Sequence, residues 1–229
     1  MEFDLILWPM LVPMIIPLIY CFRYKKESLA EIGTIATSMF LIVVIYWPLL
    51  TSNFLSTQTY TAVKFLLFII LPLLCLFILK RNKSPLKLEQ FGIKKEGIKK
   101  SLWLCILFLP IMLVVTFVIQ YVNGITLDAD ALTGIISFFE AFTEEFFFRG
   151  ILFIFLLNRT NLKIAYITSL ASFVLVHPQH FTTIFLAATI VQGILTIEIC
   201  RRSNNLTGAW LLHGINRFFI IAIVPLLLS

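Results

Sequence analysis

The sequence predicts an all-α fold: a polytopic transmembrane helical bundle with about eight spans, each near the length that a helix needs to cross a bilayer. Three observations predict it. The 229-residue chain is 60% hydrophobic and only 13% charged, and its mean hydropathy is +0.99. Apolar runs recur along the whole chain. Basic residues gather between alternate runs, as membrane topology requires. The net charge of +6 therefore indicates no nucleic-acid partner.

The apolar runs place the candidate spans, in order, at about 3–22, 32–50, 61–79, 101–122, 135–157, 164–177, 181–200 and 206–228. The sixth run is short, and the seventh follows it almost at once. The N-terminus is acidic where a cleavable signal peptide would be basic, so the first run is expected to remain as a span. The four cysteines lie in or beside apolar runs without a Cys-x-x-Cys pair and are expected to be free.

The basic residues also predict orientation and organisation. If the N-terminus is outside, the inner loops hold 15 of the 18 lysines and arginines. The positive-inside rule then places both termini outside. The longest inner loop, 80–100, alternates apolar residues with lysines and is expected to lie on the membrane surface. We divide the chain there, into 1–100 with N-terminal membrane helices and the basic cytoplasmic loop, and 101–229 as the core.

Three basic residues fall outside these loops. Lys64 lies near a helix end, from which its side chain is expected to snorkel to the membrane surface. Arg149 and Arg217 lie within spans, where a charged residue costs roughly 2.5–3.5 kcal/mol at a helix centre. Such residues persist where they are paired or perform a function.

The fifth span carries three glutamates beside Arg149. A helix turns about 100° per residue, so Arg149 lies on nearly the same face as Glu145 and is predicted to form a structural ion pair with it. Glu144 lies about 140° from Arg149 and is left without a local cation. Glu140 lies one turn before Glu144, and two such carboxylates would not both ionise easily. Glu144 is therefore the candidate for proton transfer, with Glu140 in support. The alternative is that all three acids only lock helices together.

The three histidines all lie in the last third of the chain. His177 ends the sixth span, four residues after Phe173. At roughly 1.5 Å per residue, Glu144 and His177 both lie about 20 Å from the inner membrane face, and His213 about 10 Å. A lone histidine in a bundle usually makes an interhelical hydrogen bond. A glutamate and two histidines with Asn216, on three spans, instead predict a water-binding site.

Two chemistries fit these residues. A divalent metal such as Zn²⁺ could bind Glu144, His177 and His213 and keep an open position for water. Alternatively, Glu144 acts directly as a base on water, while the histidines and Asn216 donate to a developing oxyanion. The metalloprotease signature of two histidines four residues apart around a glutamate is absent. His177 and His180 are also a weak ligand pair, because Pro178 breaks the helix that would aim them together. Both facts favour the metal-free version.

These motifs resemble the family of CAAX prenyl endopeptidases and bacteriocin-processing or immunity proteins (CPBP, Abi). Its marks are Glu-Glu-x-x-x-Arg, then Phe-x-x-x-His, then a later histidine with Asn or Asp nearby. Here they stand at 144–149, at 173–177 and at His213, within roughly 130–220. One position departs from the pattern. The usual Asn lies four residues after the last histidine, where this chain has Arg217, and Asn216 lies at three.

The resemblance implies an intramembrane endopeptidase, a hydrolase in which Glu144 activates water, His177 assists, and His213 with an amide side chain stabilises the oxyanion. It implies a peptide or protein substrate in the lipid bilayer and a bacterial plasma membrane as the location. Some members act in bacteriocin immunity, so the alternative is a non-catalytic membrane immunity or interaction protein with the same fold. A proton-relaying transporter fits less well, because paired broken helices are not seen. If Arg217 faces the pocket, it would alter the electrostatics of the pocket or mark an inactive member of the family.

Overall fold

The computed structural model describes residues 8–51, 57–81, 85–124 and 128–228, and within these ranges it contains helices and connections but no strand. The all-α membrane bundle predicted from the sequence is confirmed. The helices, in order, are η1 (Trp8–Met14) with α1 (Ile15–Tyr24), α2 (Lys26–Thr51), α3 (Thr57–Phe65) with η2 (Leu66–Ile70) and α4 (Leu71–Lys80), η3 (Leu88–Phe91), α5 (Ile98–Asn123), α6 (Ala131–Glu145) with η4 (Phe146–Phe155), α7 (Leu162–Leu175), η5 (Pro178–His180), α8 (Phe185–Ser203), and α9 (Thr207–Phe218) with η6 (Phe219–Ile223) and α10 (Val224–Leu228).

Four of these helical segments are long and apolar enough to cross a membrane, judged by their length and composition. They are Lys26–Tyr46, Thr59–Lys80, Ile98–Asn123 and Thr207–Leu228. The segment formed by α6 and η4 is also apolar, but it carries three glutamates and an arginine. Its charges are therefore the feature of the fold that most needs a physical explanation.

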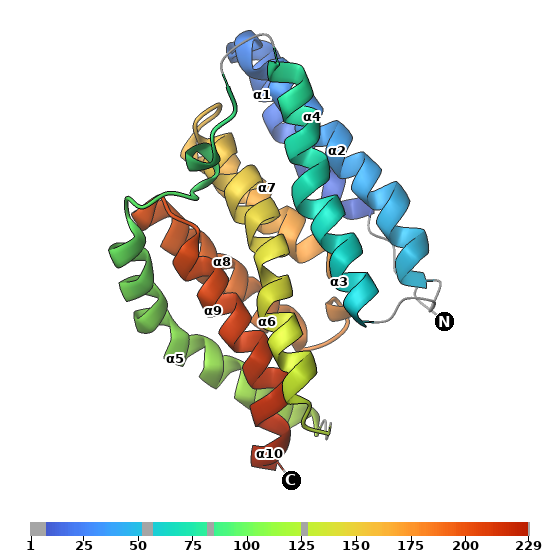
Figure 1. Ribbon diagram of the computed structural model, residues 1–229, viewed down its shortest axis with the longest axis vertical. Coiled ribbons are helices and arrows are strands. Elements are labelled where there is room, and N and C mark those ends of the chain that lie inside the picture. Colours follow the sequence, from blue (N-terminus) through green and yellow to red (C-terminus); the bar gives the residue numbers. More distant parts are fainter. Residues whose placement is uncertain (1–7, 52–56, 82–84, 125–127, 229) are drawn as a thin grey trace.

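The charged segment lies at the centre of the bundle. Figure 1 shows α9 running alongside α6, with α5 and α8 on one side and α2, α3 and α4 on the other. Every residue of η4 is buried. A helix that is apolar all round is expected at such a central position. Glu140, Glu144 and Glu145 of α6 are buried as well, so their charges need partners within the protein.

Side-chain caps set where two of the site helices begin. The carboxylate of Asp130 accepts a hydrogen bond from the backbone N–H of Thr133, at 3.0 Å, at the start of α6. The side-chain oxygen of Asn161 accepts from the N–H of Ile164, at 3.1 Å, at the start of α7. Asp and Asn are favoured at this position because they satisfy an N–H that has no partner within the helix.

Two glycines let α9 pack closely against its neighbours. A Cβ atom at Gly208 would lie 2.1 Å from the carbonyl oxygen of Ser101 in α5. One at Gly214 would lie 2.8 Å from the carbonyl oxygen of Phe138 in α6. Small residues allow membrane helices to approach this closely. Because Gly214 directly follows His213, this contact brings the His213 side chain close to the glutamates of α6.

The segment before α5 docks onto the bundle through a few of its residues, while most of residues 85–100 are exposed or half-buried, and its place at the membrane surface remains a prediction. The Phe91 side chain is fully buried and stacks on Phe155 with ring centroids 5.1 Å apart. The amide of Asn205 donates to the carbonyl of Lys94 at 2.7 Å. The alternating apolar residues suggested a surface segment, but some of them fill the core. Residues 82–84 of the loop lie outside the described ranges.

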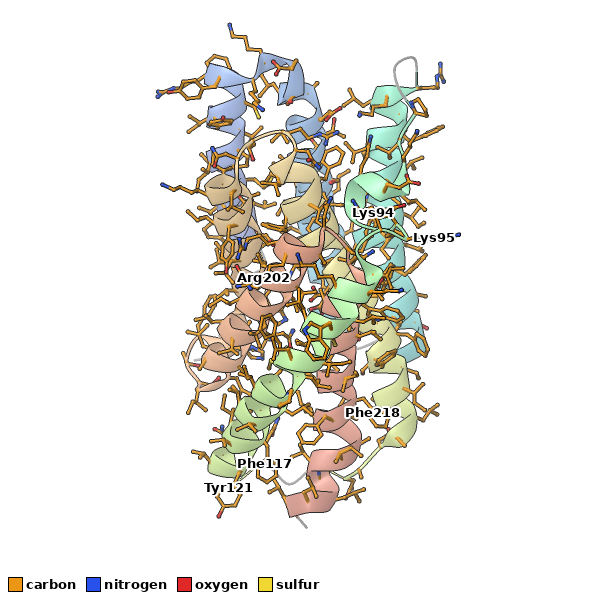
Figure 2. The ribbon with its side chains drawn as sticks, turned by 90° about the vertical axis from the view of Figure 1, so that its left-hand side faces the viewer. Lys94, Lys95, Phe117, Tyr121, Arg202 and Phe218 are labelled. Atoms are coloured by element: carbon orange, nitrogen blue, oxygen red, sulfur yellow. The ribbon has the colours of Figure 1, made fainter. Side chains whose placement is uncertain are left out.

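In Figure 2, Lys94, Lys95 and Arg202 lie near the middle of the long axis of the molecule, and Phe117 and Tyr121 lie toward its lower end. The orientation with both termini outside remains a prediction.

One ion-pair cluster joins the N-terminal helices to the rest of the bundle. Nζ of Lys80, at the end of α4, lies 2.8 Å from Oε1 of Glu31 in α2. Arg159, just after η4, contacts the other carboxylate oxygen of Glu31. The Lys80 side chain is buried. This cluster ties α2 and α4 to the end of the central helix.

Candidate active site

Two imidazoles converge on one carboxylate oxygen from separate parts of the chain. Glu144 lies in α6, His177 follows the C-terminal end of α7, and His213 lies in α9. Oε2 of Glu144 is 3.9 Å from Nε2 of His177 and 3.8 Å from Nε2 of His213. The expected depth difference of about 10 Å between His213 and the other two is therefore wrong. The start of the last span and the tilt of its helix could not be inferred from the sequence.

The second ring nitrogen of each histidine has a partner that fixes its hydrogen. Nδ1 of His177 lies 2.8 Å from the carbonyl oxygen of Phe173, which can only accept. Nδ1 of His213 lies 2.8 Å from Oε1 of Glu145. We therefore assign the hydrogen to Nδ1 in both neutral rings, which leaves a lone pair on each Nε2. Both lone pairs lie on the side of the ring that faces Glu144.

Phe173 supports both imidazoles. Its ring meets that of His177 edge-on with centroids 5.1 Å apart, and that of His213 with centroids 6.2 Å apart. The guanidinium carbon of Arg149 lies 4.1 Å from the centroid of the same ring, within the range of a cation–π contact. Phe173 is therefore a shared platform between the histidines and the buried arginine.

The structure brings Glu145 and Arg149 together. Oε2 of Glu145 lies 3.2 Å from Nε of Arg149, and both side chains are fully buried. The same Nε donates a hydrogen bond to the hydroxyl of Thr196 in α8, at 2.7 Å. The two oxygens of Glu145 thus have different partners: one meets Arg149, and the other accepts from His213.

Glu144 has no cation on its own helix, as the sequence predicts, but two cations reach it from other helices. The ammonium of Lys64 contacts the Oε1 atoms of both Glu140 and Glu144. Nη1 of Arg217 lies 3.2 Å from Oε1 of Glu140 and 3.5 Å from Oε1 of Glu144. Lys64 does not snorkel, because it is only 3% exposed. Helix geometry finds partners within α6, whereas both cations belong to other helices.

Asn216 lies beside the histidines with its amide held in place. The hydroxyl of Thr116 in α5 donates to its Oδ1 at 2.8 Å, and its Nδ2 donates to Oε1 of Gln192 in α8 at 3.1 Å. One N–H of the amide remains beyond these two bonds. Sequence reasoning missed Thr116 and Gln192. Their only signal is that each is a polar residue inside an apolar helix, which is too common to single them out.

Two cavities meet at Glu144. The smaller, of about 180 Å³, is lined by residues of α2, α3 and η2 that include Tyr46, Tyr60, Lys64 and Phe68. The larger, of about 280 Å³, is lined mainly by α5, α8 and α9 and includes Thr116, Gln120, His180, Thr189, Gln192 and Asn216. Glu144, His177, Gln179 and Arg217 line both. The carboxylate can thus be approached from two sides.

His180 lies next to the site without contacting Glu144 directly. Its ring stacks on that of His177 with centroids 5.2 Å apart, and its Nδ1 lies 2.6 Å from the hydroxyl of Thr189. These contacts place His180 on the wall of the larger cavity. It therefore provides a natural comparison for the two histidines that face the carboxylate.

The side chains do not fit a metal ion such as Zn²⁺. Among the described residues, no group of three or more His, Cys, Asp or Glu side chains is arranged to hold one. The set suggested by the sequence does converge, with Oε2 of Glu144 3.8 Å from Nε2 of His213 and 3.9 Å from Nε2 of His177, but it is not such a group.

A buried carboxylate, two imidazoles, an amide and two cations thus meet inside a helical bundle whose long apolar helices are those of an integral membrane protein. The family model for type II CAAX prenyl endopeptidase Rce1-like proteins matches residues 102–219, just over half of the chain, and the chain belongs to this family. At the level of the family it is a CAAX-type intramembrane protease. Searches of curated proteins and of solved structures found no match. The family match includes most of α5 and all the sequence motifs, but it excludes α3, which carries Lys64.

Proposed function

We propose that this protein is an intramembrane endopeptidase in which Glu144 activates a water molecule to attack a peptide bond. The observation that carries the proposal is the position of Oε2 of Glu144. This atom lies 3.9 Å and 3.8 Å from the Nε2 atoms of His177 and His213. Those separations are too long for direct hydrogen bonds and suit a bridging water. A water at this position can donate one hydrogen to Glu144 and the other to one of the two imidazoles, which is a chemically plausible arrangement for removing its proton.

In the proposed reaction, the water oxygen bonds to the carbonyl carbon of the substrate while Glu144 accepts the proton. The same proton then passes to the amide nitrogen as the C–N bond breaks, which yields a carboxylic acid and an amine. Glu145 orients His213, as a buried carboxylate orients the imidazole in a hydrolase triad. The remaining N–H of Asn216 and the guanidinium of Arg217 are the groups that could oppose negative charge on the carbonyl oxygen.

The proposed substrate is a peptide or protein segment at or within the bilayer. The larger cavity presents amide and hydroxyl groups, among them those of Gln192 and Thr116, that can bond to a peptide backbone. The family name points to a prenylated C-terminal CAAX sequence as the first peptide to try. We place the protein in a bacterial plasma membrane, with a lipid bilayer and a peptide as its partners.

The test is Glu144→Gln in purified protein, because Gln keeps the size of the side chain and removes its basicity. The substrate is a quenched fluorescent peptide ending in a farnesylated CAAX sequence, and mass spectrometry identifies the products. We expect turnover to fall by at least about 10²-fold, a typical contribution of a general base. The matched control is Glu198→Gln, a glutamate on α8 that pairs with Arg201 and Arg202. Wild-type turnover in the Glu144 variant would overturn the assignment.

A second candidate is a non-catalytic immunity or interaction protein that keeps the fold. The observation in its favour is the pairing of Glu144 with Lys64 and Arg217, together with Arg217 at the usual Asn position. Charges paired in this way also occur in sites that are only structural. For this candidate, wild-type protein and the Glu144 variant would protect cells against a bacteriocin equally well. Such protection without peptide cleavage would favour it.

A further inference from the structure

Lys64 and Arg217 make the same contacts from opposite parts of the chain. Each reaches Oε1 of Glu140 and Oε1 of Glu144. Two acids and two bases form a cluster without net charge, which is the condition under which buried charges are tolerated. Lysine is almost never fully buried unless it is paired. The burial of Lys64 is therefore explained by the glutamates of α6.

The two oxygens of Glu144 face different groups. Oε1 contacts the cations, and Oε2 has no hydrogen-bond partner among the described residues and faces the two imidazoles. A carboxylate held at one oxygen by two cations cannot turn freely about its last bond. The cations thus determine which oxygen is presented to His177 and His213.

The ammonium of Lys64 is itself held by aromatic rings. It lies 5.6 Å from the ring centroid of Tyr60 and 5.9 Å from that of Phe68. Tyr60 hydrogen-bonds through its hydroxyl to Tyr46 of α2. Helices α2, α3 and η2 thus all contribute to the position of one charge, although none of them lies in the segment that the family match covers.

We propose that Lys64 is a positioning residue of the active site. With Arg217 it holds Oε1 of Glu144 so that Oε2 faces the water between the carboxylate and the histidines, and α3 is therefore an integral part of the catalytic unit. This rests on the proposed function of Glu144. Two other roles would have different consequences. A purely structural Lys64 would affect stability alone, and a restraining Lys64 would hold Glu144 in an inactive state.

The experiment compares Lys64→Met and Lys64→Arg with Lys80→Met as the matched control. Lys80 is also a buried lysine paired with a glutamate, but it lies in the Glu31 cluster. We expect Lys64→Met to lower kcat on the farnesylated CAAX peptide roughly 10- to 100-fold, as for a misplaced catalytic group, with little change in KM. Lys64→Arg should recover most of the loss. Lys80→Met should lower Tm and leave the kcat of the folded protein unchanged.

An unchanged kcat in folded Lys64→Met would overturn the proposal, and so would an increase, which would mean that Lys64 restrains Glu144. If Lys64→Met does not fold, Lys64→Met combined with Glu140→Gln restores the charge balance and can be compared with Glu140→Gln alone. The double variant should have the lower kcat. Equal values would contradict a positioning role.

A second measurement needs no substrate. Dicyclohexylcarbodiimide couples to protonated carboxyl groups in apolar surroundings, and mass spectrometry locates the product. We expect little coupling at Glu144 in the wild type and in Lys80→Met, and clear coupling in Lys64→Met, because Glu144 then has one cation fewer. Equal coupling in all three would overturn the proposal. If the protein shows this coupling pattern but no peptidase activity, the proposed function is refuted, while the contact between Lys64 and Glu144 is still supported.

Discussion

Nδ1 of His213 lies 2.8 Å from Oε1 of Glu145, although the two residues are 68 positions apart in the chain. Glu145 is also the partner of Arg149. The adjacent Glu144 contacts a different set of groups, with Lys64 among them. Neighbouring carboxylates on one helix thus meet different cations, and His213 lies between them, with Nδ1 at Glu145 and Nε2 facing Glu144.

Glu145→Gln and Arg149→Gln should each destabilise the bundle. Each change leaves a buried charge without its partner, which typically costs about 3–5 kcal/mol. The measurement is thermal unfolding in detergent. The double variant should recover part of the loss, because no unpaired charge remains at either position. Single variants as stable as the wild type would show that the ion pair contributes little. In the folded fraction, only the Glu145 change should also lower kcat strongly, because Glu145 holds His213.

His177→Gln and His213→Gln should lower kcat by about 10²- to 10⁴-fold, the usual range for groups in acid–base catalysis. Both imidazoles face Oε2 of Glu144, whereas His180 is turned toward Thr189. The control is therefore His180→Gln, for which we expect a smaller loss. Steady-state kinetics on the CAAX peptide provides the comparison. Equal losses in all three variants would indicate that the whole cavity wall, rather than two imidazoles, is required.

Metal chelation should leave activity intact. The proposed chemistry needs no ion, because Glu144 itself removes the proton from water. Among the described residues, no group of three or more His, Cys, Asp or Glu side chains is arranged to hold a metal. The purified protein is incubated with 1,10-phenanthroline and assayed, and its metal content is measured by mass spectrometry. A loss of turnover that Zn²⁺ restores would contradict the metal-free mechanism and support the other chemistry left open by the sequence.

The topology prediction is tested with single cysteines in a background without the native four. Lys95 and Asp128 are both exposed and lie before and after α5. The positive-inside rule places the basic segment in the cytoplasm, so a membrane-impermeant thiol reagent applied to intact cells should label only position 128. Ser84, a further inner position, lies outside the described residues. Labelling at 95 alone would invert the orientation, and labelling at both would mean that the number of spans is wrong.

The sequence by itself determined the helical membrane fold and the contacts that lie within one helix. Hydrophobic runs follow from the thickness of the bilayer, so they can be read locally. The spacing of Glu145 and Arg149 likewise depends only on the turn of a helix. The order of the motifs that contain Glu144, His177 and His213 was sufficient to indicate the family.

The tertiary structure alone decided which groups surround Glu144. Lys64 and Arg217 approach it from α3 and α9, and Thr116 and Gln192 fix Asn216 from α5 and α8. These contacts depend on where helices cross, how far each is tilted and how closely glycines let them approach. A pattern along one chain carries no record of those quantities. For that reason the sequence identified Glu144 as the candidate carboxylate, whereas its charge partners became evident only in the folded structure.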